Sequence, residues 1–393
     1  MSEPILSSPC FRFTDAARQR YGERADQYLS YLFCTDPLAD AVVAALAELP
    51  GGQGHRLLDT ALNQGIEAVP DAPSALRDLF AQLDEVPFWV DWDQLDLGGA
   101  VFLRSGLFGV LTVGLVSLPL CYSSPAGNKP LVFSGQLIKR AARRLGETGR
   151  FVYLTSQPGA LRRFGEGFKA NVKVRLMHAQ VRRLLWQSGR WDSGQWGEPI
   201  NQAYMAATNL MFSVALLDGM RNLGLRFTPA EREALMQLWR YSGYLSGVAP
   251  ELLCVTESEA RRMLGMVSAL EGPPDDDSRT LINALMLAVR ALGFKPADWL
   301  TQLLYGISYG LIGEQRATAL GYPRTGLRWI VPALRPVISA VDFIRLLAPG
   351  GQRLADSLGA RGWELVIERS LAGRPPDFRL TERLAAHPRS SIA

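Results

Sequence analysis

The amino-acid sequence predicts an all-α protein in which residues 1–393 form a single large helical domain. Helix-starting signals recur along the chain, and between them apolar residues return every three or four positions. The alternation typical of a β-strand is confined to one short candidate, residues 363–367. Hydrophobic residues make up 48% of the chain, enough for a sizeable core, and no linker or repeat divides it. An N-terminal extension (about residues 1–30) and a polar tail (about 374–393) should flank the domain.

Capping residues and helix breakers delimit the individual helices. Asp36-Pro37 places a capping carboxylate before a proline at the first helical position, and this helix should stop at Pro50-Gly-Gly. Both Thr228-Pro-Ala-Glu231 and Thr256-Glu-Ser-Glu259 fit a capping box, and the second of these helices should end before Glu271. Further helices are predicted over residues 71–83, 164–186, 200–224, 279–292, 296–314 and 337–347.

The uncharged run Ser105–Tyr122 is just long enough to span a bilayer. A helix that is buried on all sides of a large α-domain has the same composition. We favour the buried helix because no second run of this quality exists in the chain. A peripheral membrane contact stays open as an alternative.

Composition narrows the classes of function. The net charge is +4, and basic residues are interleaved with acidic ones, so nucleic-acid binding is not indicated. The four cysteines are far apart and show no metal-binding spacing, which is typical of a reducing compartment. The N-terminus lacks the basic and apolar regions of a secretory signal, so we expect a cytoplasmic protein. Nothing in the sequence predicts an oligomeric state.

His178 is the most informative residue, because it is the only histidine set in a long apolar helical face. We expect His55 to lie in a glycine-rich loop and His387 to lie in the polar tail. Imidazole is the commonest metal ligand in proteins. Arg175 and Arg182 lie at the edges of the same face, so the set would suit a haem with its two propionates. The alternative is a core histidine whose ring nitrogens are satisfied by neighbours. Other residues of that face are Phe164, Gly167, Asn171, Val174, Val181 and Leu185.

A second functional face is predicted on the preceding helical stretch, where Arg144 and Thr148 lie one turn apart with Glu147 beside them. Thr148 can donate a hydrogen bond to bound oxygen, and Arg144 can stabilise developing negative charge. Glu147 can act as an acid or a base. The alternative is a solvated, salt-bridged helix face. Thr208 is the polar exception on the apolar stripe of residues 200–224; it either bonds the carbonyl four residues earlier or contacts a cofactor or substrate.

Several segments resemble, in their order and spacing, the haem b oxygenases of the latex-clearing-protein (rubber oxygenase) and MpaB type. The resemblance covers about the middle third of the chain and implies a globin-like core with haem b as the cofactor. It implies that His178 is the proximal iron ligand, that Arg144 and Thr148 line the distal side, and that Thr208 contacts haem or substrate. The implied reaction is oxidative C=C cleavage by O₂ in an apolar, alkene-bearing small molecule or polymer. The matching segments are Arg144–Thr148, Pro158-Gly159, Val174–Arg182, Ala206–Phe212 and Leu238–Tyr244.

Two features differ from the rubber-cleaving members of that family. Glu147 stands where they carry a lysine that can cap the iron, and the loop Ser123–Pro130 lacks the carboxylate that they use as a base. The sequence therefore supports haem as the cofactor better than it supports polyisoprene as the substrate. Two other classes stay open: a haem-binding sensor or carrier without turnover, and a haem-free, membrane-associated helical protein.

Overall fold

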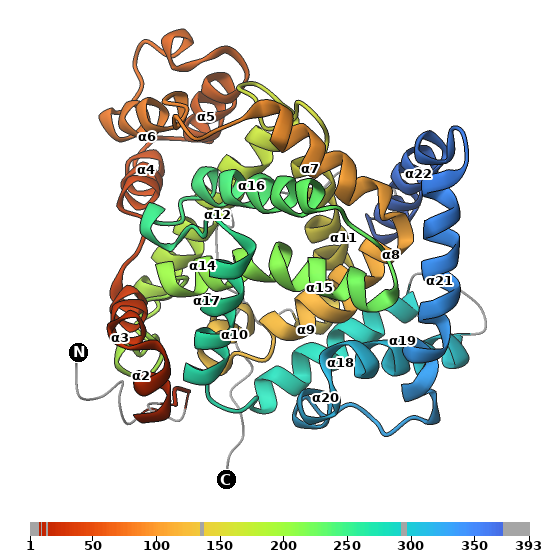
Figure 1. Ribbon diagram of the computed structural model, residues 1–393. Helices are drawn as coiled ribbons and strands as arrows, with labels where there is room; N and C mark the ends of the chain where they lie inside the picture. Colours follow the sequence, from red (N-terminus) through yellow and green to blue (C-terminus); the bar gives the residue numbers. More distant parts are fainter. Residues whose placement is uncertain (1–7, 9, 13–14, 134–136, 292–296, 372–393) are drawn as a thin grey trace.

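The structure is a computed structural model that describes residues 8, 10–12, 15–133, 137–291 and 297–371 (Figure 1). These residues form helices and no β-strand, which confirms the all-α prediction. Their only extended pairing is an isolated bridge between Phe11 and Glu271. In chain order the elements are α2 (Asp15–Tyr21), α3 (Glu23–Ser30), η1 (Tyr31–Phe33), α4 (Pro37–Ala47), α5 (Gln53–Gln64), η2 (Ile66–Ala68), α6 (Ser74–Asp84), α7 (Trp92–Arg104), α8 (Gly106–Thr112), η3 (Val113–Ser117), α9 (Leu118–Cys121), α10 (Pro125–Phe133), α11 (Leu137–Thr155), α12 (Glu166–Gln187), α13 (Ser193–Trp196), α14 (Gln202–Phe212), α15 (Val214–Leu223), α16 (Pro229–Leu245), η4 (Pro250–Leu252), α17 (Glu257–Leu270), α18 (Asp276–Ala291), α19 (Ala297–Ile312), α20 (Glu314–Ala319), η5 (Gly326–Trp329), α21 (Ile330–Leu347) and α22 (Gly351–Leu371).

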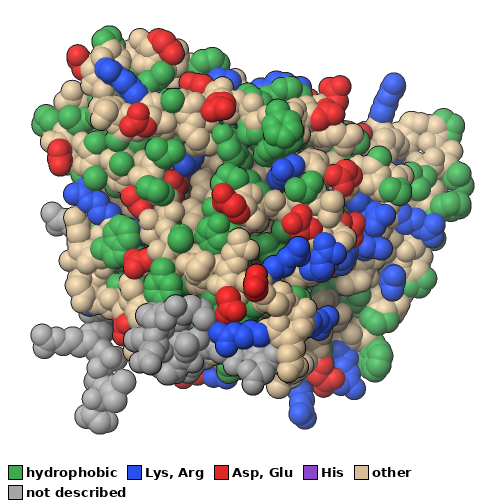
Figure 2. All heavy atoms as spheres, turned by 60° about the vertical axis from the view of Figure 1, so that its left-hand side comes forward, with side chains coloured by type: hydrophobic (Ala, Val, Ile, Leu, Met, Phe, Trp, Pro, Cys, Tyr) green, Lys and Arg blue, Asp and Glu red, His purple; other side chains and the backbone are tan. Residues whose placement is uncertain are grey.

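The helices enclose two main hydrophobic clusters. The larger one is contributed by α4 to α7, α11, α12, α16 and α22, and it holds Phe80, Phe102, Trp239 and Trp363. The second lies among η3, α18 and α19 at the opposite end of the molecule (Figure 1). Helix α11 packs against α12, α18 and α22, and thereby joins the two clusters. On the face drawn in Figure 2, basic and acidic side chains are intermixed with hydrophobic ones.

The run Ser105–Tyr122 forms α8, the π-helical turn η3 and α9, packed against α15, α19 and α22. The hydroxyl of Ser117 donates to the carbonyl of Met211 (2.7 Å), and the hydroxyl of Ser308 donates to the carbonyl of Leu115 (2.8 Å). These bonds tie the irregular turn to its neighbours. By length and composition, Glu23–Ala47 and the pair Trp92–Arg104 with Gly106–Cys121, which is bent by 90°, could each cross a membrane; core helices share that composition.

The local capping signals are mostly confirmed. Asp36 caps α4 by accepting from the backbone nitrogen of Ala39 (3.2 Å), and Thr228 forms the expected capping box with Glu231. Thr256 caps α17, but the carboxylate of Glu259 accepts from the backbone of Val255 instead of closing the box on Thr256.

Three local predictions are wrong. The strand candidate at residues 363–367 lies inside α22, where Trp363 and Ile367 are buried one helical turn apart and Leu365 is exposed. The single helix over residues 200–224 is interrupted at Ser213, whose hydroxyl donates to the carbonyl of Asn209 (2.9 Å). His55 lies in helix α5 rather than in a loop, because Gly52 adopts a left-handed conformation that starts the helix just before it.

Other predicted segments fall partly outside the described residues. The tail from residue 374, with His387, lies there entirely, as does the gap between the helices predicted at 279–292 and 296–314. Within the predicted N-terminal extension, residues 15–30 form α2 and α3. The phenol of Tyr28 in α3 donates to the carbonyl of Ala203 (3.1 Å), so this segment packs on the helix that carries Thr208.

Candidate active site

A large cavity of about 1790 Å³, which opens to the surface, brings most of the predicted site residues together. Ligand pockets usually measure roughly 300–1,000 Å³, so this cavity has room for a cofactor and a substrate together. Arg144, Glu147 and Thr148 reach it from α11, His178 from α12 and Thr208 from α14. Trp239, Ser242 and Gly243 of α16 contribute a further wall. Residues separated by up to a hundred positions in the sequence therefore face one space.

Helix α12 is fixed against α11 and α16 by a buried amide. The side-chain nitrogen of Asn171 donates to the hydroxyl of Thr155 (3.0 Å) and to the carbonyl of Gly167 (2.8 Å). Its side-chain oxygen accepts from the hydroxyls of Ser242 (2.7 Å) and Ser246 (3.0 Å). A fully satisfied buried network of this kind specifies one packing arrangement. It holds the helix that carries His178 at a defined distance from the helix that carries Arg144.

We expect Asn171→Ala to lower the free energy of unfolding by about 2–3 kcal/mol, because it leaves the buried hydroxyls of Thr155 and Ser242 and the partly buried hydroxyl of Ser246 without their partner. Chemical denaturation measures this loss directly. Asn63→Ala is the matched control: Asn63 is exposed and bonds only its own helix, at Asp59 (2.7 Å), so its loss should cost less than about 0.5 kcal/mol. Equal effects of the two substitutions would contradict a structural role for the network.

His178 points into the cavity as a neutral imidazole. Burial, assisted by the nearby charge of Arg182, lowers the pKa of His178 to about 4. Its Nδ1 is buried and has no hydrogen-bond partner among the described residues. A neutral, unpaired imidazole is suited to ligate a metal. The described residues contain no cluster of three or more His, Cys, Asp or Glu side chains that would hold a free ion, so a single imidazole fits a cofactor that brings its other ligands with it.

Arg144 and Thr148 present unused hydrogen-bonding groups to the same cavity. Neither side chain makes a hydrogen bond or an ion pair with another described residue, although both line the wall. Glu147 also lines the cavity, and its carboxylate accepts from Nε of Arg143 (2.8 Å). The sequence left open a salt-bridged helix face as the alternative, and the Arg143–Glu147 salt bridge is present. Both residues of the pair, however, line the cavity.

Arg175 and Arg182 are not among the residues that line the cavity. Both guanidiniums extend from α12 toward the start of α4. Arg175 forms a two-point ion pair with Asp36 (2.6 and 2.9 Å), and Arg182 bonds Asp40 (2.8 Å). The backbone of Gly247 passes so close to the first pair that a Cβ there would clash with the carboxylate of Asp36. The structure thus ties these two arginines to carboxylates, away from the position predicted for propionate partners.

Thr208 makes the local hydrogen bond that one interpretation of its sequence position predicts, and it also lies at the cavity. Its hydroxyl donates to the carbonyl of Tyr204 (2.8 Å), four residues earlier, while the side chain lines the cavity. Met205, Met211 and Phe212 of the same apolar stripe also line it. Residues of this type at helical spacing are usually plain core. Here they belong to the buried core and also form an apolar wall of the cavity.

Glu271 is the cavity residue that the sequence analysis missed. It follows the last residue of α17, and its carboxyl accepts from the hydroxyl of Ser124 (2.9 Å). Burial raises the pKa of Glu271 to about 8, and the hydroxyls of Ser124 and Tyr204 offset only part of that rise. The Tyr204 hydroxyl is buried without a well-aligned hydrogen bond. The segment Ser123–Pro130, predicted as a loop, lies from Pro125 onward in α10, so that prediction is wrong. The segment has no carboxylate of its own, but the fold brings Glu271 against it at Ser124.

Tryptophans after α12 close another side of the cavity. Trp191 and Trp196 both line it, with their rings edge to face at 5.2 Å. Trp186 lies outside the lining, and its indole nitrogen donates to Glu198 (2.7 Å). Both tryptophans that follow α12 therefore belong to the cavity wall, whereas Trp186 within α12 does not.

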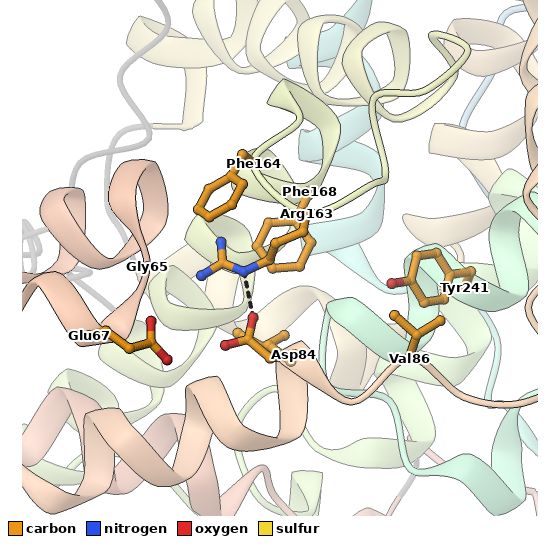
Figure 3. Close-up of a pocket in the computed structure, with 9 residues that line it drawn as sticks. Gly65, Glu67, Asp84, Val86, Arg163, Phe164, Phe168 and Tyr241 are labelled. Atoms are coloured by element: carbon orange, nitrogen blue, oxygen red, sulfur yellow. Dashed lines mark hydrogen bonds and ion pairs between the residues drawn. The ribbon is translucent and has the colours of Figure 1, made fainter.

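A second, smaller cleft of about 280 Å³ shares no lining residue with the large cavity (Figure 3). Its centre is Arg163, which pairs with Asp84 and stacks over the ring of Phe164 at 4.3 Å. None of the sequence-predicted catalytic or metal-binding residues lies in this cleft. The candidate site is therefore the large cavity.

Comparison with known protein families shows the class to which this helical chain belongs. Residues 103–343 match the family described as "ER-bound oxygenase mpaB/B'/Rubber oxygenase, catalytic domain", and the chain belongs to this family. The rubber oxygenase of Streptomyces sp. (strain K30) is 27% identical over 226 residues, which are 56% of this chain and 55% of that protein. The match thus spans only about half the length of this curated relative.

A solved structure extends the likeness beyond the family segment. The latex clearing protein LCP in its closed state superposes with a TM-score of 0.69, over 86% of this chain and 91% of that chain, at 23% identity. At this identity the match shows a shared fold.

Proposed function

We propose that the protein is a haem b oxygenase that uses O₂ on an apolar, alkene-bearing substrate, with oxidative cleavage of a C=C bond as the reaction. The observation that carries the proposal is a single neutral, unpartnered imidazole, His178, in a cavity of about 1790 Å³ that also exposes Arg144 and Thr148. Membership of an oxygenase family supports it. The apolar wall that includes Phe212 and Trp239 suits an isoprenoid-like substrate.

The residues present fit a haem. His178 would be the protein ligand to the iron, because its ring is neutral, faces the cavity and has an unpaired nitrogen. When bound, haem b supplies the iron chemistry by which O₂ is activated. Side chains of the protein would bind and orient the substrate, transfer protons and exclude water.

The polar groups of the cavity differ in what they can do. The guanidinium of Arg144 can stabilise negative charge that develops on oxygen, and the hydroxyl of Thr148 can donate a hydrogen bond to it. A carboxylate oxygen of Glu147 can accept a proton and return it, with Arg143 holding its orientation. Phe151, Phe212 and Trp239 keep water away from the reacting carbons.

The first experiment is the visible spectrum of protein produced with ample iron and haem precursor. We expect a Soret band for the wild type and its loss in His178→Ala. His55→Ala is the control, since His55 also lines the cavity but lies on the exposed surface of α5. Haem uptake that does not depend on His178, or no uptake after reconstitution, would refute the cofactor assignment.

Turnover is tested separately with apolar alkenes under ¹⁸O₂. Incorporation of the label into carbonyl products is the expected result for oxidative C=C cleavage. A haem-loaded protein that leaves a panel of such alkenes unchanged would refute the catalytic part of the proposal. The protein would then be a haem-containing sensor or carrier.

A further inference from the structure

The cavity contains a polar cluster that the proposed mechanism does not use. Ser124 immediately precedes α10, Tyr204 lies in the first turn of α14 and Glu271 follows α17, and all three residues line the cavity. The hydroxyl of Ser124 accepts from the backbone nitrogen of Gly127 (3.1 Å) and donates to Oε2 of Glu271 (2.9 Å). A Cβ on Gly127 would lie 3.1 Å from the ring of Tyr204, so the tyrosine packs against the same turn. We call Ser124, Tyr204 and Glu271 the Glu271 cluster.

The Glu271 cluster holds a hydrogen-bond donor that lacks an acceptor. Burial raises the pKa of Glu271 to about 8, so at neutral pH its carboxyl keeps a proton. Because Oε2 accepts from Ser124, the proton belongs on Oε1, which makes no well-aligned hydrogen bond with a described residue. The nearby hydroxyl of Tyr204 is also buried without a well-aligned hydrogen bond. An oxygen atom of a bound molecule would supply the missing acceptor.

The chemistry of the cluster favours a neutral partner. No ion pair joins Glu271 to a basic residue among the described residues, because Lys129 of α10 pairs with Asp275 (3.0 Å) and Asp277 (2.5 Å) instead. Arg12 lines the cavity as an exposed side chain. An ionised head group buried at the cluster would therefore lack a counter-charge, which is unfavourable. A hydroxyl or carbonyl oxygen accepts the proton of Glu271 without that cost.

Helix α14 connects the cluster to the apolar wall of the same cavity. Tyr204 lies near its start and Phe212 is its last residue, so the two are about 12 Å apart along the helix at 1.5 Å per residue. The ring of Phe212 stacks on Trp239 at 5.3 Å, and both line the cavity. One wall of the cavity therefore changes from polar to apolar along its length. This arrangement suits an elongated molecule with an oxygen at one end and a hydrocarbon chain beyond it.

We propose that the Glu271 cluster binds the oxygen-bearing end of the substrate, which is an elongated alkenol or an unsaturated ketone or aldehyde rather than a plain hydrocarbon or a carboxylate. Oε1 of Glu271 donates to the substrate oxygen, and Ser124 holds the carboxyl in the orientation that this requires. The inference rests on the proposed function for the fate of the C=C bond. It adds that anchoring one end of the chain selects which C=C bond is placed for reaction.

The test compares three ligands of the same carbon number by equilibrium dialysis of the purified protein under argon, where no O₂ supports turnover. The ligands are geraniol (an alkenol), myrcene (an alkene without oxygen) and geranate (a carboxylate). We expect the wild type to bind geraniol roughly tenfold more tightly than myrcene, and more tightly than geranate. Glu271→Leu should remove the preference for geraniol and leave the binding of myrcene unchanged. Glu271→Gln should keep the preference, because the amide it introduces can still donate.

Glu48→Leu is the matched control, since Glu48 is exposed and does not line the cavity. This variant should bind all three ligands as the wild type does. Equal affinity of the wild type for geraniol and myrcene, or for geraniol and geranate, would overturn the proposal even if Glu271→Leu fails to fold. A preference for geraniol that survives in a folded Glu271→Leu variant would overturn it too, and an ordered water would then be the partner of the cluster.

Turnover of the same ligands under ¹⁸O₂ separates this inference from the proposed function. We expect the haem-loaded protein to cleave geraniol in preference to myrcene. Cleavage of both at equal rates would overturn the role of the Glu271 cluster and leave the oxygenase proposal standing. Preferential binding of geraniol without cleavage of either ligand would refute the catalytic proposal, while the binding role of the cluster would be supported.

Discussion

Replacing Arg175 with leucine should destabilise the protein by about 3–5 kcal/mol, because it leaves a carboxylate buried without its counter-charge. The side chains of Arg175 and Asp36 are each only 4% exposed, and two short hydrogen bonds join them. The third guanidinium nitrogen of Arg175 donates to the side-chain oxygen of Gln82 (2.7 Å). Loss of Arg175 therefore removes the donors to both Asp36 and Gln82. Chemical denaturation of the variant and the wild type measures the loss.

A double-mutant cycle separates the ion pair from the packing of the long side chain. Asn is as good a helix N-cap as Asp, so Asp36→Asn removes the charge while it keeps the cap of α4. The double variant should be less destabilised than the sum of the single variants. Arg18→Leu is the matched control: the Arg18–Asp26 pair is 45% and 44% exposed, and its loss should cost less than about 1 kcal/mol. Additive effects in the cycle would show that the buried charges do not interact.

Local signals in the sequence were enough to place much of the helical framework. The capping residues Asp36 and Thr228 act on neighbours two to four positions away, so their effect can be read without knowledge of the fold. The break at Ser213 has no such signal, because no glycine or proline interrupts residues 200–218. It depends on how α14 and α15 pack against other helices, which is tertiary information.

For the candidate site too, some residues could be predicted from local patterns, whereas their partners depend on the fold. Helical periodicity put Arg144 beside Thr148, and the resemblance paired them with His178; the fold brings all three to one cavity. Periodicity also placed Arg175 near the face of His178, but it could not show that α4 would supply Asp36 as its partner. A helical wheel gives the direction of a side chain and not the identity of the helix that it meets.

Glu271 was missed because nothing near it in the sequence distinguishes it. It follows the end of a helix and precedes Gly-Pro-Pro, a position where a carboxylate is normally solvated. Its burial comes from contacts with residues far away in the sequence, Ser124 and Tyr204. The pKa of about 8 for Glu271 therefore arises only when the fold buries this carboxyl in the cavity.

Replacing Glu271 with glutamine should make the protein more stable than the wild type at alkaline pH. The pKa of Glu271 is about 8 in the folded protein against an ordinary value of 4.5, since burial disfavours the ionised carboxylate. Below pH 4.5 both states hold the proton and the group has no effect. Between pH 4.5 and about 8 the unfolded chain loses the proton while the folded chain keeps it, so stability falls as pH rises. Above pH 8 the loss levels off, on the order of 3–5 kcal/mol in all.

Glutamine removes this dependence while it can still accept the hydrogen bond from Ser124. The stability difference between Glu271→Gln and the wild type should therefore grow from pH 5 to pH 8 and then stay constant. Denaturant titrations at pH 5, 6.5, 8 and 9 measure it, with Glu48→Gln as the control at an exposed position. A difference that does not change with pH would mean that Glu271 is ionised in the folded protein throughout this range. In that case the cavity would hold a permanent negative charge near Tyr204.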